Sequence, residues 1–344
     1  MSMQDAQVTG SQVLLRSALS YDAASRASGG KKAFVKATEL LVENMMESVT
    51  KRLEIGMLHG GSGLVTAASS SNSSATVTVI TATTAAFAAG IWAGSEGTQV
   101  NFYNVATLIS SAADSIFTIT AVDVDARTLT VTGTSTGISA LDTAIGANAN
   151  VIAAYYYGAY GAEMVGLKKI ITNTGTLFNI NASTYNLWKG NTATVSGALT
   201  FGKVLSAVSK AVNRGLNEAV VCLVNPTTWA NLASDLAALR RFDDSYSKKE
   251  VDSGSESLCY YGQNGKIEVM SHNCVKEGEA FIFPPKKVKR IGSQDVSFKT
   301  PGREDEIFLH RPDNAAYELR LYTDQSVFVE TPARCIYVTG FVNV

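Results

Sequence analysis

Residues 31–58 read KKAFVKATELLVENMMESVTKRLEIGML, a run without proline in which Gly56 is the only glycine. Four apolar residues recur in it at intervals of three and four: Val42, Met46, Val49 and Leu53. Charged side chains lie largely on the opposite side, so the spacing predicts one long amphipathic helix. We expect the four apolar residues to pack against the rest of the fold. The glycine-rich residues 60–63 should end the helix.

The segment before this helix predicts a strand. Residues 11–21 have no helical spacing of apolar side chains, and Gly29-Gly30 separates them from the helix. Val13-Leu14-Leu15 would be apolar on both faces of a strand, which is unusual for an exposed segment. Because an unpaired apolar strand promotes aggregation, we expect this one to lie against a neighbouring copy more than against its own core.

Residues 59–162 form a block with very few charged side chains, namely Glu96, Asp114, Asp123, Asp125, Arg127 and Asp142. Residues 76–79 and 128–132 alternate between threonine and aliphatic residues, the pattern of a half-buried strand. Residues 116–122 should pair with 128–132 through a turn at 123–126. A further strand is expected over 151–157. We interpret the block as an all-β insertion.

Residues 163–300 alternate between helical and strand patterns. Thr200 is a candidate cap for a helix that Gly215 closes, residues 219–224 predict a buried strand, and Thr227 should open a second helix. In that helix Trp229 should face inward, with Arg240-Arg241 at its end. The polar residues 243–257 predict a mobile loop. Strands are expected over 266–270 and 280–283, and again from Tyr317 onward. The fold class is therefore α+β.

Composition narrows the possible functions. The chain has 344 residues and a net charge of -1, so it lacks the excess of cations that a stand-alone nucleic-acid binder needs. Charged residues make up 17%, against about 25% in ordinary soluble domains, which suggests that other subunits cover much of the surface. The four cysteines are scattered and form no C-x-x-C pair, and no stretch of about 18 apolar residues suggests a membrane span.

The motifs that could carry catalysis are weak. Residues 197–204 approach a phosphate-binding loop, but Val204 stands where a magnesium-binding hydroxyl is needed, so a helix start is favoured. Gly61-Ser62-Gly63 lacks the closing glycine of a nucleophile elbow. Three histidines are candidate bases, His59, His272 and His310, and none has an evident triad partner. We expect His59 to be a protonated imidazole that stabilises a helix end, and His272 and Cys274 are too few for a metal site.

Two charged clusters remain. Asp114, Asp123 and Asp125 could bind calcium, but Asp-x-Asp in a hairpin favours turn chemistry. The basic cluster after Pro284-Pro285 comprises Lys286, Lys287, Lys289 and Arg290. We interpret it as a subunit contact, with a solvated edge strand or a weak nucleic-acid contact as alternatives.

Several stretches, taken in order, resemble tailed-bacteriophage major capsid proteins. The resemblance lies in the long helix ending Lys51-Arg52-Leu53-Glu54 and in the following Leu58-His59-Gly60-Gly61-Ser62-Gly63-Leu64. Similar stretches follow at 163–167, 188–191, 224–226 with Trp229 and Leu232, 275–280 and 289–292. They are spread over residues 31–342.

The resemblance implies the Hong Kong ninety-seven-type capsid fold, with an axial domain, a peripheral domain that carries a long spine helix, and an extended loop. It maps residues 1–30 to an arm or loop segment and 31–58 to the spine helix. Residues 59–165 become a β-rich part of the peripheral domain or an insertion, 166–300 the axial domain, and 301–344 the C-terminal strands of the peripheral domain. Family members usually have more chain before the spine helix, so the N-terminus is expected to be short.

The resemblance implies a structural protein, without enzymatic activity or cofactors, that self-assembles into the icosahedral head shell around double-stranded DNA. Its partners would be itself, in hexamers and pentamers, and scaffolding, portal or decoration proteins, with no membrane. It would reside in the virion capsid after assembly in the host cytoplasm. The alternatives are a tail-tube or other virion structural protein and, less favoured, an α/β hydrolase. Our candidates for core or subunit contacts are Leu53, Met46, Val49, Trp229, Arg240, Arg241, Lys286, Lys287, Lys289 and Arg290.

Overall fold

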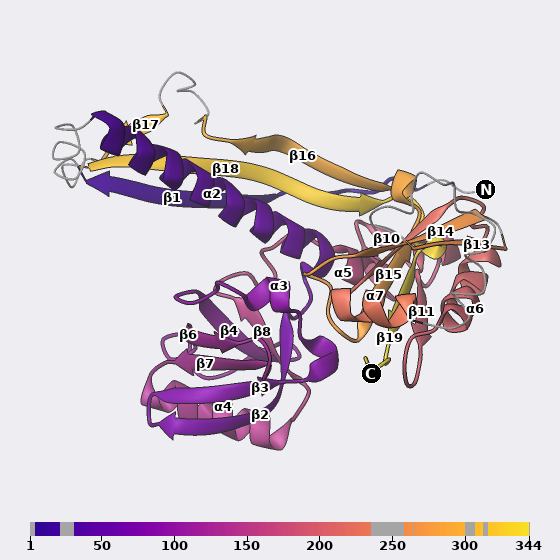
Figure 1. Ribbon diagram of the computed structural model, residues 1–344, viewed down its shortest axis with the longest axis horizontal. Helices are drawn as coiled ribbons and strands as arrows, with labels where there is room; N and C mark the ends of the chain where they lie inside the picture. The colour runs from indigo at the N-terminus through magenta and orange to yellow at the C-terminus, as the bar shows by residue number, and fades with distance from the viewer. Residues whose placement is uncertain are drawn as a thin grey trace.

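The computed structural model describes residues 4–20, 31–234, 258–263, 265–299, 307–311 and 316–343. The protein is a mixed α/β structure in three parts (Figure 1). A long strand ribbon with one helix along it extends beyond the other two parts, a closed antiparallel sheet and a six-stranded mixed sheet. No helix within the described ranges is long and apolar enough to cross a membrane.

The ribbon is built on β18 (Ala316–Val329). β1 (Ser11–Ser20) pairs with one side of it, and β16 (Val288–Ser297) and β17 (Phe308–His310) pair in turn with the other. Helix α2 (Lys31–His59) runs along the ribbon. Twenty-nine helical residues span about 43 Å, and the fourteen residues of β18 span about 46 Å. The two longest elements are therefore matched in length.

The helix forms where the sequence predicts it, but its buried face is rotated. Met45, Val49 and Leu53 are buried, whereas Met46 is 38% exposed and Val42 only partly buried. The expectation that Met46 packs into the core was therefore wrong. Met45, Val49 and Leu53 form one row at intervals of four residues, and Met46 lies about 100° further round the helix from Met45.

The strand β1 is confirmed, but it is not unpaired within its own chain. All ten of its residues pair with β18, from Ser11 opposite Gln325 to Ser20 opposite Ala316. Leu15 packs against the core, and Leu14 on the other face is exposed. The premise that this strand is unpaired was therefore wrong, because one of its edges is fully used by β18. The greater contact with a neighbouring copy than with its own core stays a prediction.

The low-charge block folds into a closed antiparallel sheet in which six strands pair in a ring, in the order β4-β6-β7-β3-β2-β8 and back to β4. Their bounds are β2 Val65–Ser74, β3 Val77–Ala82, β4 Gln99–Asn104, β6 Phe117–Asp123, β7 Thr128–Thr132 and β8 Ile152–Tyr156. The predicted hairpin of β6 and β7 is confirmed. Short elements join them: β5 (Thr107–Leu108), α3 (Ala89–Trp92) and a 3-10 turn at Thr84–Ala86.

The interpretation of this block as all-β was wrong, because it contains the helix α4 (Ser135–Ala147). Thr134 caps this helix by accepting a hydrogen bond from the Gly137 backbone N–H. Ile138, Leu141 and Ile145 are buried at helical spacing. The abundance of small residues and threonine in the segment hid this short apolar row.

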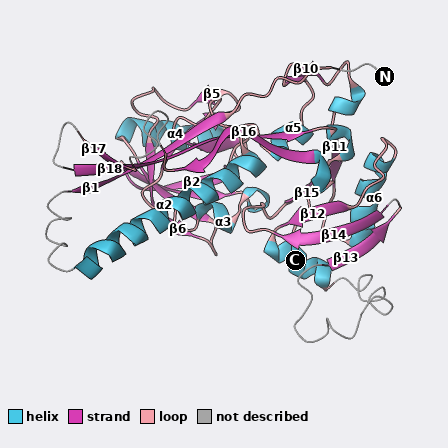
Figure 2. Cartoon of the chain, turned by 90° about the horizontal axis from the view of Figure 1, so that it is seen from above, coloured by secondary structure: helices cyan, strands magenta, loops and turns pink. Residues whose placement is uncertain are grey.

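The third part is a six-stranded mixed sheet in the order β11-β19-β15-β12-β14-β13. Its strands are β11 Asn191–Thr194, β12 Val220–Val224, β13 Leu258–Gly262, β14 Gly265–Ser271, β15 Glu279–Phe283 and β19 Ile336–Thr339. Helix α6 (Phe201–Val212) lies beside this sheet (Figure 2), and α7 (Pro226–Ala233) lies near it in Figure 1. Side chains of both helices join the core of the sheet. The remaining elements are α5 (Leu167–Ile171), β9 (Thr176–Leu177), β10 (Ile180–Asn181) and 3-10 turns at Asn186–Trp188, Pro285–Lys287 and Pro332–Arg334.

Two expectations here need adjustment. Thr200 precedes α6, but its side chain makes no capping hydrogen bond. Trp229 is only partly buried against the sheet core, and the buried residues of α7 are Thr228 and Leu232. Arg240, Arg241 and the loop at 243–257 lie outside the described residues.

Candidate functional site

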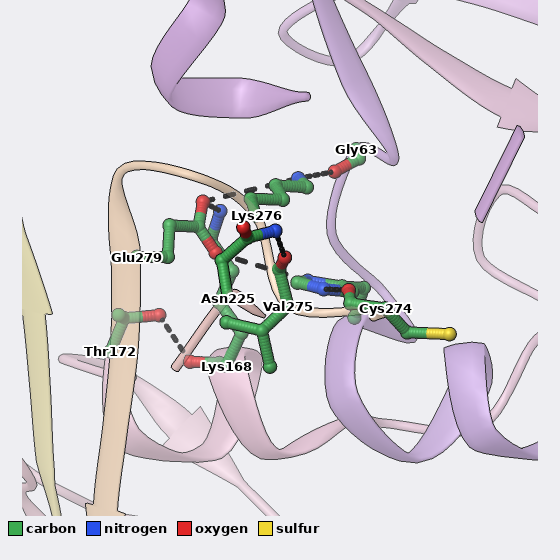
Figure 3. A network of polar contacts seen from close by, with 9 residues as sticks. Gly63, Lys168, Thr172, Asn225, Cys274, Val275, Lys276 and Glu279 are labelled. Carbon is green, nitrogen blue, oxygen red and sulfur yellow. Dashed lines mark hydrogen bonds and ion pairs between the residues drawn. The ribbon is translucent and has the colours of Figure 1, made fainter. Parts of the chain in front are cut away.

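Four ionisable side chains meet where the three parts of the chain join (Figure 3). His59 ends α2, Lys168 lies on α5, Lys276 lies in the turn before β15, and Glu279 begins β15. We call these four residues the buried charged cluster. Lys276, Glu279 and His59 are at most 5% exposed, and the side chain of Lys168 is 21% exposed, so most of the cluster is withdrawn from solvent.

Glu279 is the anion of this cluster. Its Oε1 accepts a hydrogen bond of 2.6 Å from Nζ of Lys168 and lies 3.9 Å from Nζ of Lys276. Burial alone would raise the pKa of this carboxyl, but Lys276 and Lys168 together lower it to about 2. Burial alone would lower the pKa of the Lys168 amine, but the attraction of Glu279 outweighs burial and raises that pKa. Lys168 and Glu279 therefore form an ionised pair.

Lys276 is the second cation, and it competes for the same carboxylate oxygen. Its Nζ donates a hydrogen bond of 2.7 Å to the carbonyl oxygen of Gly63, at the start of the closed sheet. Burial, with repulsion from Lys168, lowers the pKa of Lys276 to about 7 although Glu279 opposes the shift. A fully buried amine with this pKa loses its proton close to neutrality, and it keeps its hydrogen bond to Gly63 in either form.

His59 is a neutral member of the cluster. Its Nε2 donates a hydrogen bond of 2.9 Å to the carbonyl oxygen of Cys274, which leaves Nδ1 unprotonated and 3.9 Å from Oε2 of Glu279. Burial lowers the pKa of His59 to about 3, with Lys276 as a second cause. The expectation that His59 is protonated at the helix end was therefore wrong, because burial removes the water that would solvate the charge.

The turn that carries Lys276 also joins the closed sheet to the mixed sheet through other bonds. Arg127 makes two hydrogen bonds of 2.9 Å to the carboxylate of Glu277. The backbone N–H of Glu277 donates to Phe87, and that of Gly278 donates to Ala85. On the other side, Asn225 donates 2.8 Å to the carbonyl oxygen of Val275. Residues 274–279 thus connect the parts of the chain, and the buried charged cluster at their centre serves cohesion.

Sequence reasoning missed this cluster. Lys168 falls on a helix of only five residues, and Lys276 and Glu279 stand in a run of charges that is typical of an exposed turn. The one available signal was the placement of Glu279 next to the apolar residues 280–283.

The weak catalytic motifs take structural roles. In the segment resembling a phosphate-binding loop, Nζ of Lys203 donates to the carbonyl oxygens of Ser196 and Ala198, so the amine is held by the backbone. This supports the interpretation as a helix start. Nδ1 of His272 accepts a hydrogen bond from the Cys274 backbone N–H, and Nε2 lies 3.9 Å from Glu54. Nδ1 of His310 lies 3.1 Å from the Arg311 carbonyl oxygen.

The aspartates of the closed sheet form turns. Asp123 accepts a hydrogen bond from the Ala126 backbone N–H, and Asp114 accepts from the hydroxyls of Ser111 and Thr134. These bonds favour the turn interpretation over calcium. Within the described ranges, no group of three or more His, Cys, Asp and Glu side chains could hold a metal ion.

The basic cluster is partly neutralised within the chain. Lys287 and Lys289 both pair with Glu330, and Arg290 pairs with Asp295 at 2.8 Å. The subunit-contact interpretation stays a prediction. The ion pairs reduce the charge that the cluster could present to nucleic acid.

The exposed surface of the ribbon and α2 carries several large apolar side chains. Six large apolar side chains are exposed there: Leu14, Leu40, Met46, Ile291, Ile307 and Phe308. Such a surface fits a subunit that packs against neighbours.

No protein-family model matches the sequence, and no curated protein matches it. Solved structures similar to it include the capsid asymmetric unit of Cyanophage A-1(L), with 13% identity, a TM-score of 0.38, and coverage of 53% of this chain and 61% of that one. The satellite phage P4 procapsid including size determination (Sid) protein has 7% identity, a TM-score of 0.36, and coverage of 99% and 74%. The holo-SrpI encapsulin complex from Synechococcus elongatus has 12% identity, a TM-score of 0.30, and coverage of 48% and 59%.

The chain spans less than two thirds of the length of the cyanophage protein and of the encapsulin. Likeness at this level leaves the function to the geometry of the chain itself.

Proposed function

We propose that this protein is the repeating subunit of a closed shell, the virion capsid of a tailed phage. The observation that carries the proposal is the ribbon with α2 along it. This pair of elements extends beyond the two compact parts and exposes apolar side chains on both the helix and the strands. A surface of this kind is stable in water when other copies cover it.

The chemistry of the interior supports a structural role. The ionisable side chains of the buried charged cluster pair with one another and with backbone carbonyls, and all but Lys168 are closed to solvent. A hydrolytic enzyme needs an accessible nucleophile with a base beside it. The cluster instead holds three parts of one chain together, which is what a subunit under mechanical load requires.

In the full proposal the fold is of the Hong Kong ninety-seven type. Residues 166–300 form the axial domain except for β16, which belongs to the ribbon, and β19 joins the axial sheet. The peripheral domain is built from α2 and the ribbon strand β18. Copies assemble as hexamers and pentamers in the host cytoplasm, with scaffolding, portal or decoration proteins as further partners. A net charge of -1 suits a shell that encloses double-stranded DNA by volume and counterions, with little direct binding.

Electron microscopy of the expressed full chain tests this function. We expect closed shells tens of nanometres across, formed by the chain alone or after concentration with a crowding polymer. Tubes would favour a tail-tube protein instead. A chain that remains monomeric under all these conditions, as measured by sedimentation, contradicts the proposal.

A further inference from the structure

The ribbon has two edges that differ in kind. On one side, β16 carries two register shifts, between Ile291 and Gln294 and between Gln294 and Ser297. Its exposed side chains include the charged Lys289 and Arg290. Bulges and charges of this sort prevent a further strand from adding to a sheet.

The other edge is β1, and it has none of these protections. Its pairing with β18 is continuous over ten residues, its sequence SQVLLRSALS holds neither proline nor glycine, and Arg16 is its one charged residue. Among the residues that the structure describes, no strand pairs with the outer edge of β1. Its outward N–H and C=O groups are therefore available to an added strand.

We propose that the outer edge of β1 pairs antiparallel with β1 of a second copy, across a two-fold axis that passes through Leu14. The two ribbons then form one continuous sheet, with the two β1 strands at its centre. This inference rests on the proposed function only in that it assumes self-association, and it names the place where two copies meet.

Symmetry fixes which faces match. A two-fold axis that relates adjacent antiparallel strands stands perpendicular to the sheet, so opposite residues point to the same face. Val13 and Leu15 are partly buried, and Leu15 packs against the core that α2 shares, whereas Gln12, Leu14 and Arg16 are exposed. In the pair, both copies of α2 therefore lie on one side of the joined sheet.

Charge and exposure select the register. An axis through Arg16 would place two guanidinium groups opposite each other, which is unfavourable. An axis through Leu14 places Arg16 opposite Gln12 of the second copy, and Val13 opposite Leu15. It also covers Leu14, which is 52% exposed in the single chain, with its own counterpart. Because β1 would pair with β1 of a second copy, no different protein is needed to supply a complementary strand.

A charge-swap experiment on the full chain tests the pairing. Leu14→Glu and Leu14→Lys each place like charges opposite each other, and because Leu14 is exposed both variants should fold, which circular dichroism checks. We expect each variant alone to associate at least tenfold more weakly than wild type by analytical ultracentrifugation. A 1:1 mixture should restore association. If the mixture behaves like the separate variants, the inference is overturned.

Disulfide mapping tests the register independently. Leu14→Cys should form a covalent dimer on mild oxidation. Gln12→Cys and Arg16→Cys should each fail alone, because four residues separate equivalent positions by about 13 Å, and should cross-link when mixed. The matched control is Glu43→Cys on the exposed side of α2, and wild type controls for the four native cysteines. Absence of the Leu14→Cys dimer overturns the inference.

The outcomes separate this inference from the proposed function. Shells without any β1 cross-link would refute the β1 pairing and leave the shell function standing. A specific Leu14→Cys dimer from a chain that never forms shells would support the β1 pairing and refute the shell function.

Discussion

Nζ of Lys276 lies 2.7 Å from the carbonyl oxygen of Gly63, a residue 213 positions earlier in the chain. This hydrogen bond joins the turn before β15 to the start of the closed sheet. The same amine lies 3.9 Å from Glu279, whose carboxylate is already paired with Lys168. One buried carboxylate thus faces two amines, and the protonation of the second amine links pH to the cohesion of the fold.

We expect stability to rise with pH above neutrality because of Lys276. Burial lowers its pKa from 10.5 to about 7, so between these values the unfolded chain binds more protons than the folded one. The free energy of unfolding then increases with pH, by roughly 1 kcal/mol per pH unit. Urea unfolding at pH 7.5 and 9.5 should show this rise in wild type and a smaller one in Lys276→Met. The exposed Lys286→Met is the control, and equal slopes in all three proteins would contradict the prediction.

His59 should make the fold sensitive to acid. Burial lowers its pKa from 6.5 to about 3, so the unfolded chain gains a proton first as the pH falls through this range. The free energy of unfolding therefore decreases progressively as the pH falls from 6.5 to about 3. His59→Gln keeps a donor for the Cys274 carbonyl oxygen and should flatten the loss between pH 6.5 and 4.5. Glu279, with its pKa lowered to about 2, acts below that window. An unchanged profile in the variant would show that His59 is not responsible.

The bidentate pair of Arg127 and Glu277 should couple the closed sheet to the mixed sheet. A double-mutant cycle with Arg127→Ala and Glu277→Ala should give a coupling free energy of about 1 kcal/mol, since the pair is well aligned but partly exposed. Chemical denaturation measures it. Arg290→Ala with Asp295→Ala, an exposed pair, provides the comparison and should give a smaller value. Equal couplings would argue against a special role for Arg127.

Two adjacent methionines test the rotated face of α2. Met45 is 4% exposed and Met46 is 38% exposed. Met45→Ala should destabilise the chain by about 2–4 kcal/mol, close to the effect of Leu53→Ala, because a cavity is left in the core. Met46→Ala should change stability by less than about 1 kcal/mol. Thermal unfolding of the two variants under identical conditions decides the matter, and a reversed order would refute the assigned face.

Replacing either of two glycines by alanine should change the stability of the protein, in opposite directions. A Cβ on Gly166 would lie 2.5 Å from the Gly60 backbone nitrogen and 2.7 Å from the Gly56 carbonyl oxygen. Gly166→Ala should therefore destabilise strongly, and soluble yield should fall. A Cβ on Gly146, within α4, meets nothing within 4 Å. Gly146→Ala should stabilise by up to about 1 kcal/mol through helix propensity. A stable Gly166→Ala protein would contradict the close packing at Gly60.

The elements that sequence predicts well are those with a local periodic signal. The helix over 31–58 is observed as Lys31–His59, and the hairpin of β6 and β7 has the predicted turn at Asp123. Each depends on spacing within one segment, and such spacing is visible without knowledge of the partner.

The parts that sequence could not supply depend on which segments meet. Lys168, Lys276 and Glu279 look like ordinary surface charges until the chain brings them together in a dry site. Met45 and Met46 have the same chemistry, so only the position of the ribbon decides which is buried. The pairing of β1 with β18 was missed for the same reason, because β18 lies about 300 residues away.

The close approach of Gly60 and Gly166 has a practical consequence. The backbone N–H of Gly166 donates 2.8 Å to the carbonyl oxygen of Gly60, so the chain leaves the body of the protein and returns to it at nearly the same point. Everything between these residues is an excursion whose two ends already touch. A foreign domain with adjacent termini would meet the same attachment geometry, and it would also have to replace the bonds of Ala85, Phe87 and Arg127 to residues 277–278. In the proposed shell, a domain inserted at this point would be displayed once on every subunit.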